Sequence, residues 1–464
     1  MELSENTFDV IVVGAGTGGA IAARFAAENG LEVCLIDRKE RNKIGNKICG
    51  DAVGKEVFDI LNIDHPSGKE LSCTIKGVKL YSPDRTKCIT MIDPRQTGYV
   101  VNRVEFGQRL LNDAINAGVK QFLDETMALD LIYDNDIVNG VTVKLKDGTK
   151  IDLKSKILID ASGLYSPLKK KIKFDIIEKD FSKDDAIICY REIIDFPAKD
   201  QEIQDLEYIS IILDQEKAPG GYIWYFPRNK YSFNIGLGVF MDYKGKVKEL
   251  YKENVFKEYV KTSNIEIHSS GGGVCPVRRP IWTCVANGII FVGDSALQVN
   301  PLHGGGIDPS MRAGFFAANT AAGAIQSGDY SIDKLWDYNV KIMTNFGAEF
   351  AALDLLRRVL QSLNNSDLNF GLGKELLTAS EILQIAETGG ITLSLWNMAF
   401  KAFKGISRPK LLLDLNYLRI RMSEIYALYE NFPRNYNQFE EWKKKVQVVY
   451  DKIHKMIIEV KNNK

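Results

Sequence analysis

The sequence has few residues from which a metal site or a disulfide framework could be built. Its 464 residues include only 4 histidines and 7 cysteines. No two cysteines form a CxxC pair or stand at a spacing typical of zinc ligands. We therefore expect no metal and, in a reducing cytosol, free thiols. Basic and acidic residues number 60 each, so the formal net charge is +0. Nucleic acid is not expected as a partner, because a duplex binder needs an excess of cations.

Long apolar runs are also missing. No stretch reaches the roughly 18 consecutive apolar residues that a membrane-spanning helix needs. Residues 1–9 lack the cationic start and apolar core of a secretory signal. We therefore expect a cytoplasmic protein. At roughly 100–200 residues per domain, the length predicts several domains.

The N-terminal part alternates between strand-like and helix-like segments. Residues 8–14 form a short Val/Ile-rich run that predicts a buried strand. Residues 20–29 are rich in alanine and predict a helix, which Gly30 closes. Residues 31–36 predict a second strand. This order is typical of the start of a Rossmann-type sheet.

A glycine-rich turn joins the first strand to the helix. The sequence Gly14-Ala-Gly16-Thr-Gly18-Gly19 matches the fingerprint G-x-G-x-x-G, in which the glycines permit a tight turn, close approach of a pyrophosphate and close helix–strand packing. The helix N-terminus offers free N–H groups to the phosphates. Asp37 ends the second strand, where an acid binds a ribose diol. These residues predict a site for FAD or NAD rather than NADP.

A second glycine-rich segment lies far downstream. It reads Gly293-Asp294, then Gly304-Gly305-Gly306-Ile307, and a helix is predicted further along, over 315–325. This arrangement resembles the second FAD fingerprint of the p-hydroxybenzoate-hydroxylase-like flavoproteins. The resemblance implies that Asp294 binds the ribityl or pyrophosphate region and that Gly305, Gly306 and Ile307 approach the flavin. It therefore favours FAD as the cofactor.

Three smaller features fit the same family. Arg103, before a helix predicted over 104–117, resembles the arginine that contacts the cofactor, although a surface salt bridge is an alternative. Met127 stands where the family makes a backbone contact to adenine, although a core position is equally plausible. The strand over 157–160 ends in Asp160-Ala-Ser-Gly163, a slight departure from the family's Asp-Gly motif. The sequence has no second fingerprint for a nicotinamide domain. Electrons are therefore expected from transiently bound NAD(P)H or from ferredoxin.

An aromatic motif narrows the resemblance. The segment Pro219-Gly-Gly-Tyr222-Ile-Trp224-Tyr-Phe226-Pro227 matches the P-x-x-Y-x-W-x-F-P motif of geranylgeranyl reductases. Alternation along a strand places Tyr222, Trp224 and Phe226 on one face, where they can form an apolar wall for a prenyl chain. An aromatic core strand is the alternative.

The loop over 43–54 resembles the family's Cys-Gly loop near the flavin, which implies that Cys49, Gly50 and Ala52 border the cofactor. Reduction of an isoprenoid C=C needs a hydride, which reduced flavin supplies, and a proton. Ordinary thiols are mostly protonated at neutral pH, so Cys49 is the candidate catalytic residue. The alternative is that Cys49 is only a small residue that permits close approach to the flavin. His303 is a candidate substrate contact or a loop-packing residue.

The predicted fold is α/β, with a Rossmann-type FAD-binding domain, an antiparallel-sheet substrate domain and a helical C-terminal region. The predicted limits are 1–75, 100–172 and 285–330 for the FAD-binding domain, 76–99 and 173–284 for the substrate domain, and 331–464 for the helical region. In the last, residues 393–404 mix apolar and basic side chains at helical spacing. Three alternatives are open for this segment: contact with a lipid surface, a cap over a prenyl tunnel, or packing against the rest of the protein.

The resemblance as a whole, over residues 8 to 330, is to archaeal geranylgeranyl reductases. It implies FAD-dependent reduction of geranylgeranyl chains, as the diphosphate or in ether-lipid precursors. Peripheral membrane contact is also expected. A flavin monooxygenase or halogenase on the same fold is the main alternative. A prenyl-lipid carrier that retains FAD only as a structural element is another.

Overall fold

The first predicted strand lies at the centre of an eight-stranded sheet. In this computed structural model, β1 (Thr7–Val13) pairs in parallel with β2 (Val33–Ile36) and with β11 (Lys150–Asp160). Every side chain of β2 is buried, as its apolar sequence predicts. The strand order is β17-β18-β11-β1-β2-β8, and β10 and β9 continue from the first half of β11. The other strands are β8 (Gln121–Leu123), β9 (Met127–Asp134), β10 (Ile137–Lys144), β17 (Val285–Ala286) and β18 (Ile289–Phe291).

The structure describes residues 6–92, 97–196, 205–260, 264–376, 378–388 and 408–462. The amphipathic segment predicted over 393–404 lies outside these residues. In the described part, no helix combines the length and apolar character needed to cross a membrane.

Three helices pack together beside this sheet. Helix α1 (Thr17–Glu28) contacts α3 (Arg103–Asn116) and α7 (Ile307–Ser327). A Cβ on Gly314 of α7 would lie 2.3 Å from the carbonyl oxygen of Gly18, so glycine is needed for this close packing. Helix α7 begins at Ile307, several residues before the predicted start. Pro309 is compatible with that start, because the first turn of a helix needs no N–H from it.

The second layer is a seven-stranded sheet of order β16-β12-β15-β14-β13-β5-β6. Its neighbours are antiparallel, except for the parallel pair β13–β5. Its strands are β5 (Gly77–Tyr81), β6 (Cys88–Ile92), β12 (Ala186–Asp195), β13 (Tyr208–Ile212), β14 (Ile223–Asn229), β15 (Ser232–Phe240) and β16 (Glu266–Pro276). The short strands β3 (Ala52–Gly54), β4 (Leu71–Ile75) and β7 (Gly98–Val101) form a third sheet in the order β3-β7-β4. The small helices are α2 (Glu56–Leu61), α4 (Pro167–Lys171), α5 (Val247–Tyr251) and α6 (Lys257–Tyr259).

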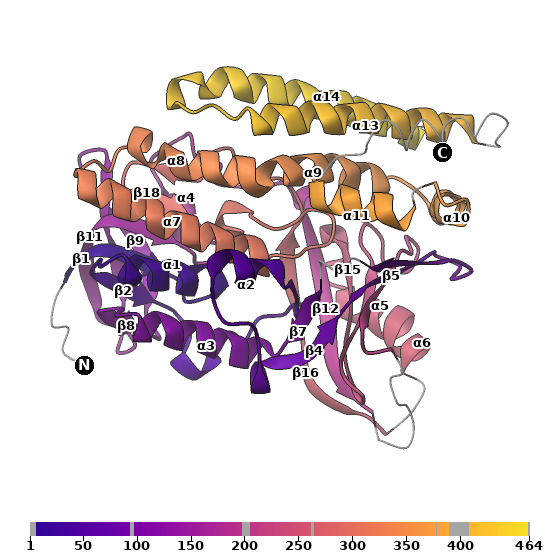
Figure 1. Cartoon of the computed structure of the whole chain (residues 1–464), viewed down its shortest axis with the longest axis horizontal. Coiled ribbons are helices and arrows are strands. Elements are labelled where there is room, and N and C mark those ends of the chain that lie inside the picture. The colour runs from indigo at the N-terminus through magenta and orange to yellow at the C-terminus, as the bar shows by residue number, and fades with distance from the viewer. Residues whose placement is uncertain are drawn as a thin grey trace.

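The C-terminal helices cover both sheet layers in Figure 1, with α13 and α14 outermost. They are α8 (Ile332–Ile342), α9 (Ala348–Leu360), α10 (Asn365–Gly373), α11 (Ala379–Thr388), α13 (Pro409–Glu430) and α14 (Phe439–Asn462). The predicted α/β fold with a helical C-terminal region is confirmed. The domain limits stay a prediction.

Candidate functional site

The main cavity lies where the eight-stranded sheet, the seven-stranded sheet and the C-terminal helices meet. Its volume is about 1840 Å³, and residues of all three layers line it. One part is bordered by the glycine-rich loops that the sequence singles out. The other part is bordered by apolar side chains from the seven-stranded sheet and from the C-terminal helices. The cavity can therefore hold a polar dinucleotide and an apolar chain side by side.

The turn after β1 has the geometry of a dinucleotide cradle. Gly14 has φ +103°, which only glycine adopts without strain. A Cβ on Gly19 would lie 1.8 Å from the carbonyl oxygen of Gly14, so Gly19 lets α1 pack on the turn. A Cβ on Gly16, in contrast, would meet no atom within 4 Å. No side chain caps the N-terminus of α1. The open space and free N–H groups fit a bound pyrophosphate.

Two charged side chains stand beside this turn. The Asp37 carboxylate accepts hydrogen bonds from the backbone N–H groups of Ala15 (2.7 Å) and Lys39 (2.8 Å), which fix its position. Arg103 is buried, and its Nη2 donates to Oγ1 of Thr17 over 3.2 Å. Its Nε and Nη1 atoms are buried without a partner. Since a buried guanidinium needs acceptors, these orphaned donors fit an anionic cofactor in the cavity.

The turn after β11 is fixed by hydrogen bonds. Asp160 is fully buried, and its carboxylate accepts from the N–H and Oγ of Ser162 and from Oγ of Ser166. Burial nevertheless raises the pKa of Asp160. Lys169 Nζ donates to the carbonyl oxygen of Ser295 over 2.7 Å, which ties this turn to the second glycine-rich segment. Ser162, which belongs to the altered form of the motif, therefore helps to fix this turn through its two hydrogen bonds to Asp160.

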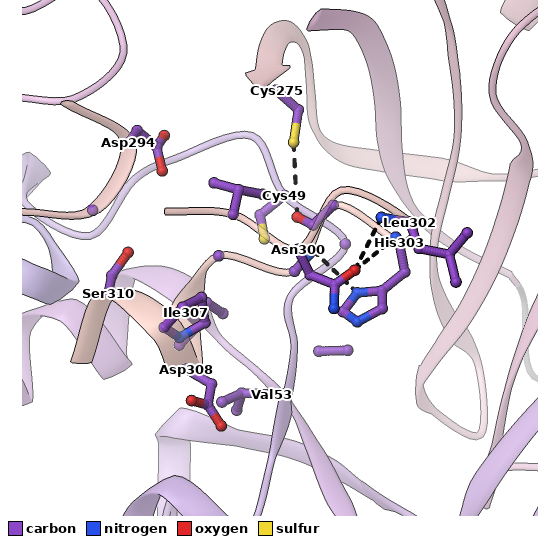
Figure 2. Close-up of a pocket in the computed structure, with 18 of the residues that line it drawn as sticks. Cys49, Val53, Cys275, Asp294, Asn300, Leu302, His303, Ile307, Asp308 and Ser310 are labelled. Carbon is purple, nitrogen blue, oxygen red and sulfur yellow. Dashed lines mark hydrogen bonds between the residues drawn. The ribbon is translucent and has the colours of Figure 1, made fainter. Parts of the chain in front are cut away.

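The second glycine-rich segment closes the other side of the cavity. Asp294 forms an ion pair with Lys47, with 2.7 Å between Oδ2 and Nζ, and the negative charge of Asp294 raises the pKa of Lys47. Asn300 Oδ1 accepts from the N–H groups of Leu302 and His303, which fixes the loop before α7. Figure 2 shows Asp294, Cys49 and this loop around the same space. No side chain caps the N-terminus of α7, so its N–H groups can face a ligand.

His303 connects the glycine loop to the aromatic wall. Its Nδ1 accepts from the N–H of Gly305 over 3.1 Å, and its carbonyl oxygen accepts from the hydroxyl of Tyr222 over 2.6 Å. Desolvation within the cavity lowers the pKa of the imidazole to about 4, so the ring is neutral at pH 7. A neutral ring suits an apolar substrate better than a charged one would.

The Cys49 loop contacts strands β14 and β15 of the seven-stranded sheet. Asn234 Nδ2 donates to the carbonyl oxygen of Cys49 and to Oδ2 of Asp51, both over 2.8 Å. A Cβ on Gly50 would lie 2.7 Å from the ring of Phe226, so glycine is required for this approach. The half-buried Cys49 thereby lines the cavity.

The aromatic motif borders the cavity, and its role as a wall for a prenyl chain stays a prediction. Tyr222, Trp224 and Phe226 all line the cavity, from β14 and the residue before it. Trp224 Nε1 donates to Oδ1 of Asn234 over 3.0 Å, which satisfies the indole. Since Asn234 also binds the Cys49 loop, one side chain positions both the wall and the loop.

The apolar part of the cavity includes residues that the sequence did not single out. Its lining comes from strands β5, β6 and β13 and from helices α9, α10, α11 and α13. Helix α13 contributes Leu411, Leu415, Leu418 and Met422. Their spacing predicts a helix face, but gives no sign of what that face covers. The loop residue Lys47 was missed for a similar reason, because its partner Asp294 is distant in sequence.

The structure brings all but one of the predicted site residues to this cavity. The lining includes Gly14, Gly16, Gly18, Asp37, Cys49, Gly50, Ala52, Arg103, Met127, Tyr222, Trp224, Phe226, Asp294, His303, Gly305, Gly306 and Ile307. Gly19 does not line it and instead packs against Gly14. Met127 is 49% exposed, so it is not a core residue.

Comparisons with known proteins agree with this site. A model of the geranylgeranyl reductase catalytic domain matches residues 185–274, and a model of FAD dependent oxidoreductases matches residues 9–164. The chain is 36% identical over 459 residues to the digeranylgeranylglycerophospholipid reductase of Sulfolobus acidocaldarius, covering 98% of this chain and 100% of that protein. The chain belongs to the geranylgeranyl reductase family. Another member, the digeranylgeranylglycerophospholipid reductase of Methanothrix thermoacetophila, is 34% identical over 78% of this chain and 89% of its own length.

Solved structures share the fold of this reductase family member. A geranylgeranyl bacteriochlorophyll reductase-like protein from Thermoplasma acidophilum has a TM-score of 0.76 at 24% identity, covering 89% of this chain and 99% of that one. A myxobacterial chondrochloren halogenase has a TM-score of 0.62 at 15% identity, covering 88% and 99%. At these identities the likeness concerns the fold alone. The prediction of an FAD-dependent reductase is therefore confirmed by the family, and the halogenase alternative rests on fold similarity only.

Proposed function

We propose that this chain reduces carbon–carbon double bonds in the geranylgeranyl chains of membrane phospholipid precursors. The observation that carries the proposal is the single cavity in which the dinucleotide cradle adjoins a long apolar lining. The names of the relatives, digeranylgeranylglycerophospholipid reductases, support a lipid with two such chains. Geranylgeranyl diphosphate is the alternative form of the same prenyl group.

In this proposal, different groups of residues bind the cofactor, orient the substrate and exclude water. The glycine turn, Asp37, Arg103 and Asp294 hold FAD, which supplies a hydride from its reduced ring when bound. Trp224 and the rest of the aromatic wall orient the prenyl chain against the flavin. The apolar lining excludes water, which protects the reduced cofactor from side reactions.

The first test is anaerobic reduction of the purified holoenzyme with dithionite, followed by addition of a digeranylgeranylglycerophospholipid. We expect the extracted lipid to gain mass in steps of two hydrogens while the flavin is reoxidised. An unchanged lipid mass, with flavin that is reoxidised only by air, would contradict the reductase proposal and favour oxygen chemistry. Repeating the test with geranylgeranyl diphosphate decides between the two forms of substrate.

Cys49 is our candidate for delivering the proton. It lines the cavity beside the glycine loop, and its backbone is held by Asn234. We expect Cys49→Ser to slow alkene reduction by at least about tenfold, since positioned acid catalysis is typically worth 10² to 10⁴ in rate. The measurement is single-turnover reoxidation of the reduced flavin by the lipid. Cys88→Ser, at an exposed thiol on β6, is the matched control. An unchanged single-turnover rate in Cys49→Ser would leave the thiol a packing role only.

The electron donor is proposed to be NAD(P)H or ferredoxin. In the part of the chain that the structure describes, no second strand–turn–helix unit like the one at Gly14 is present to bind a nicotinamide nucleotide. A donor must therefore reach the flavin from outside or bind transiently. Anaerobic flavin reduction by each donor in turn distinguishes them.

Peripheral contact with a lipid surface is proposed for α13. Its inner face lines the cavity, whereas Leu413, Tyr417 and Ile420 on its outer face are 60%, 37% and 39% exposed. A helix with one face on the substrate cavity and an apolar outer face suits a protein whose substrate is a membrane lipid. We expect Leu413→Glu/Ile420→Glu to reduce co-sedimentation with ether-phospholipid vesicles by at least about tenfold. Val448→Glu on α14, at a side chain 50% exposed, is the control. Equal binding of both variants would contradict the α13 contact.

A further inference from the structure

One buried amide lies between the Cys49 loop and the aromatic wall. Asn234 stands on β15, and its side chain is fully buried. Its Oδ1 accepts from Nε1 of Trp224 over 3.0 Å, and its Nδ2 donates to the carbonyl oxygen of Cys49 and to Oδ2 of Asp51, both over 2.8 Å. The indole can only donate, whereas the carbonyl and carboxylate oxygens can only accept. The amide therefore satisfies all three partners in this one orientation.

The sheet is built so that the indole reaches this amide. Across β14 and β15, Trp224 pairs with Gly236 and Phe226 pairs with Asn234. Asn234 and Gly236 are two residues apart on one strand, so they share a face. A Cβ on Gly236 would lie 2.3 Å from Cζ2 of the indole and 2.6 Å from Cε2. Glycine at this position therefore lets the ring lie over β15, with its N–H directed at Asn234.

The loop is also in close contact with the sheet on either side of Cys49. Ile48 lies against β16, where a Cβ on Gly271 would be 2.7 Å from its Cδ1. Gly50 lies equally close to an aromatic ring of β14. Such apolar contacts have no preferred direction, whereas a hydrogen bond has a defined geometry. The bond from Asn234 therefore adds a fixed orientation to a loop that is already packed on the sheet.

We propose that Asn234 is a positioning residue that couples the aromatic wall to Cys49. Trp224 then has two roles. Its ring borders the prenyl chain, and its N–H holds the Asn234 amide in the orientation that fixes the backbone of Cys49. A prenyl chain that packs on the wall thus acts on the same hydrogen bonds that hold the thiol. This inference rests on the proposed delivery of a proton by Cys49, and it names the residue that keeps the thiol in place.

The first test separates the two roles of Trp224. It is single-turnover reoxidation of the dithionite-reduced holoenzyme over a range of digeranylgeranylglycerophospholipid concentrations. Trp224→Phe keeps an aromatic ring but removes the N–H. We expect the maximal rate to fall at least about fivefold, the lower limit for leaving a buried acceptor unsatisfied, and the half-saturating lipid concentration to change less than about twofold. A ring that serves only as a wall would instead raise that concentration at an unchanged maximal rate.

The second test needs no turnover and reports on Cys49 directly. Burial raises the pKa of five thiols, to about 11 for Cys73, to about 12 for Cys34, Cys189 and Cys284, and well above the usual range for Cys275. Because the thiolate is the reactive form, brief treatment of the oxidised holoenzyme with iodoacetamide labels chiefly Cys49 and the exposed Cys88. We expect the ratio of Cys49 to Cys88 labelling, measured by mass spectrometry, to rise at least about fivefold in Asn234→Leu and in Trp224→Phe.

Asn254→Leu is the matched control. The Asn254 amide also donates to a backbone carbonyl, that of Lys217 over 2.9 Å, but it lies outside the lining of the main cavity, so Cys49 should be labelled as in the wild type. The double variant Trp224→Phe/Asn234→Leu should label Cys49 no faster than Asn234→Leu alone, because both changes remove the same link. An unchanged labelling ratio in Trp224→Phe, or effects that multiply in the double variant, would overturn the coupling.

Melting temperature and flavin content are measured for every variant, and if Asn234→Leu fails to fold, Trp224→Phe decides. The two tests also separate this inference from the proposed function. A wild type that reduces no lipid would contradict the proposed function, whereas the labelling ratios would still decide whether Asn234 and Trp224 hold Cys49 in place.

Discussion

The substitutions Gly16→Ala and Gly19→Ala are both expected to weaken FAD binding, but for two different reasons. A Cβ at Gly16 has no protein atom within 4 Å, and Gly16 has an ordinary φ of −67°. Gly16→Ala should therefore fold normally but bind FAD about 10- to 100-fold more weakly, because the methyl group takes space left for the pyrophosphate. A Cβ at Gly19 would lie 1.8 Å from the Gly14 carbonyl oxygen, so Gly19→Ala must displace the turn itself. Gly19→Ala should fail to bind FAD, and its apoprotein should melt at a lower temperature than the wild-type apoprotein.

The measurements are fluorescence titration of each apoprotein with FAD and thermal melting without FAD. Gly323→Ala, inside α7 with no atom within 4 Å of its Cβ, is the control. It should retain FAD and gain about 0.5–1 kcal/mol of stability from the helix propensity of alanine. If Gly16→Ala bound FAD as tightly as the wild type, the glycine turn would not be the pyrophosphate site.

The cofactor part of the site could be predicted because its signals are local. Gly14, Gly16 and Asp37 are separated by short stretches whose strand–turn–helix pattern fixes where they meet. Asp294 and the glycine loop follow the same logic at the end of β18. The turn geometry depends on residue types within a few positions, so a single sequence contains the information.

The apolar part of the cavity could not be predicted to the same extent, because it depends on contacts between distant segments. Helix α13 carries apolar residues on two faces, Leu415 on the inner one and Leu413 on the outer one, and only tertiary packing decides which face covers the cavity.

A large loss of stability is expected on substitution of Asp354, a fully buried carboxylate of α9. It accepts hydrogen bonds from Nε of Arg358 (3.0 Å), from Arg357 and from the hydroxyl of Tyr450 on α14 (3.0 Å). It belongs to a cluster of buried ion pairs that joins α9 and α14 to the segments before β12 and after β16. The charged members are Glu178, Asp185, Arg278, Arg279, Asp354, Arg357 and Arg358.

Asp354→Asn keeps the volume but removes one of the three carboxylates that balance the four arginines of this cluster. Breaking a buried charge network in this way typically costs about 3–5 kcal/mol, because the remaining charges lose their partner in a medium that solvates them poorly. We expect a loss of that size at pH 7, measured by urea denaturation of the FAD-saturated protein. Tryptophan fluorescence reports on the region, since Trp282 and Trp442 contact each other beside the cluster.

Asp337→Asn is the matched control. Asp337 pairs with Lys341 over 2.6 Å on α8, but its side chain is 60% exposed, and an exposed pair of this kind contributes at most about 0.5 kcal/mol. A loss in Asp354→Asn no larger than that of the control would show that the cluster does not hold the helical layer in place.

The same carboxylate gives the stability a defined pH dependence. The arginines hold the pKa of Asp354 well below its usual range in the folded protein, whereas in the unfolded chain it is about 3.9. A group whose pKa is depressed by folding contributes its full stability above the unfolded pKa and loses it as the pH falls toward the folded one. The difference between wild type and Asp354→Asn should therefore be constant from pH 7 to about pH 5 and shrink below about pH 4. A difference that instead grew with acid would mean that Asp354 is protonated in the folded protein and that the arginines are balanced by other groups.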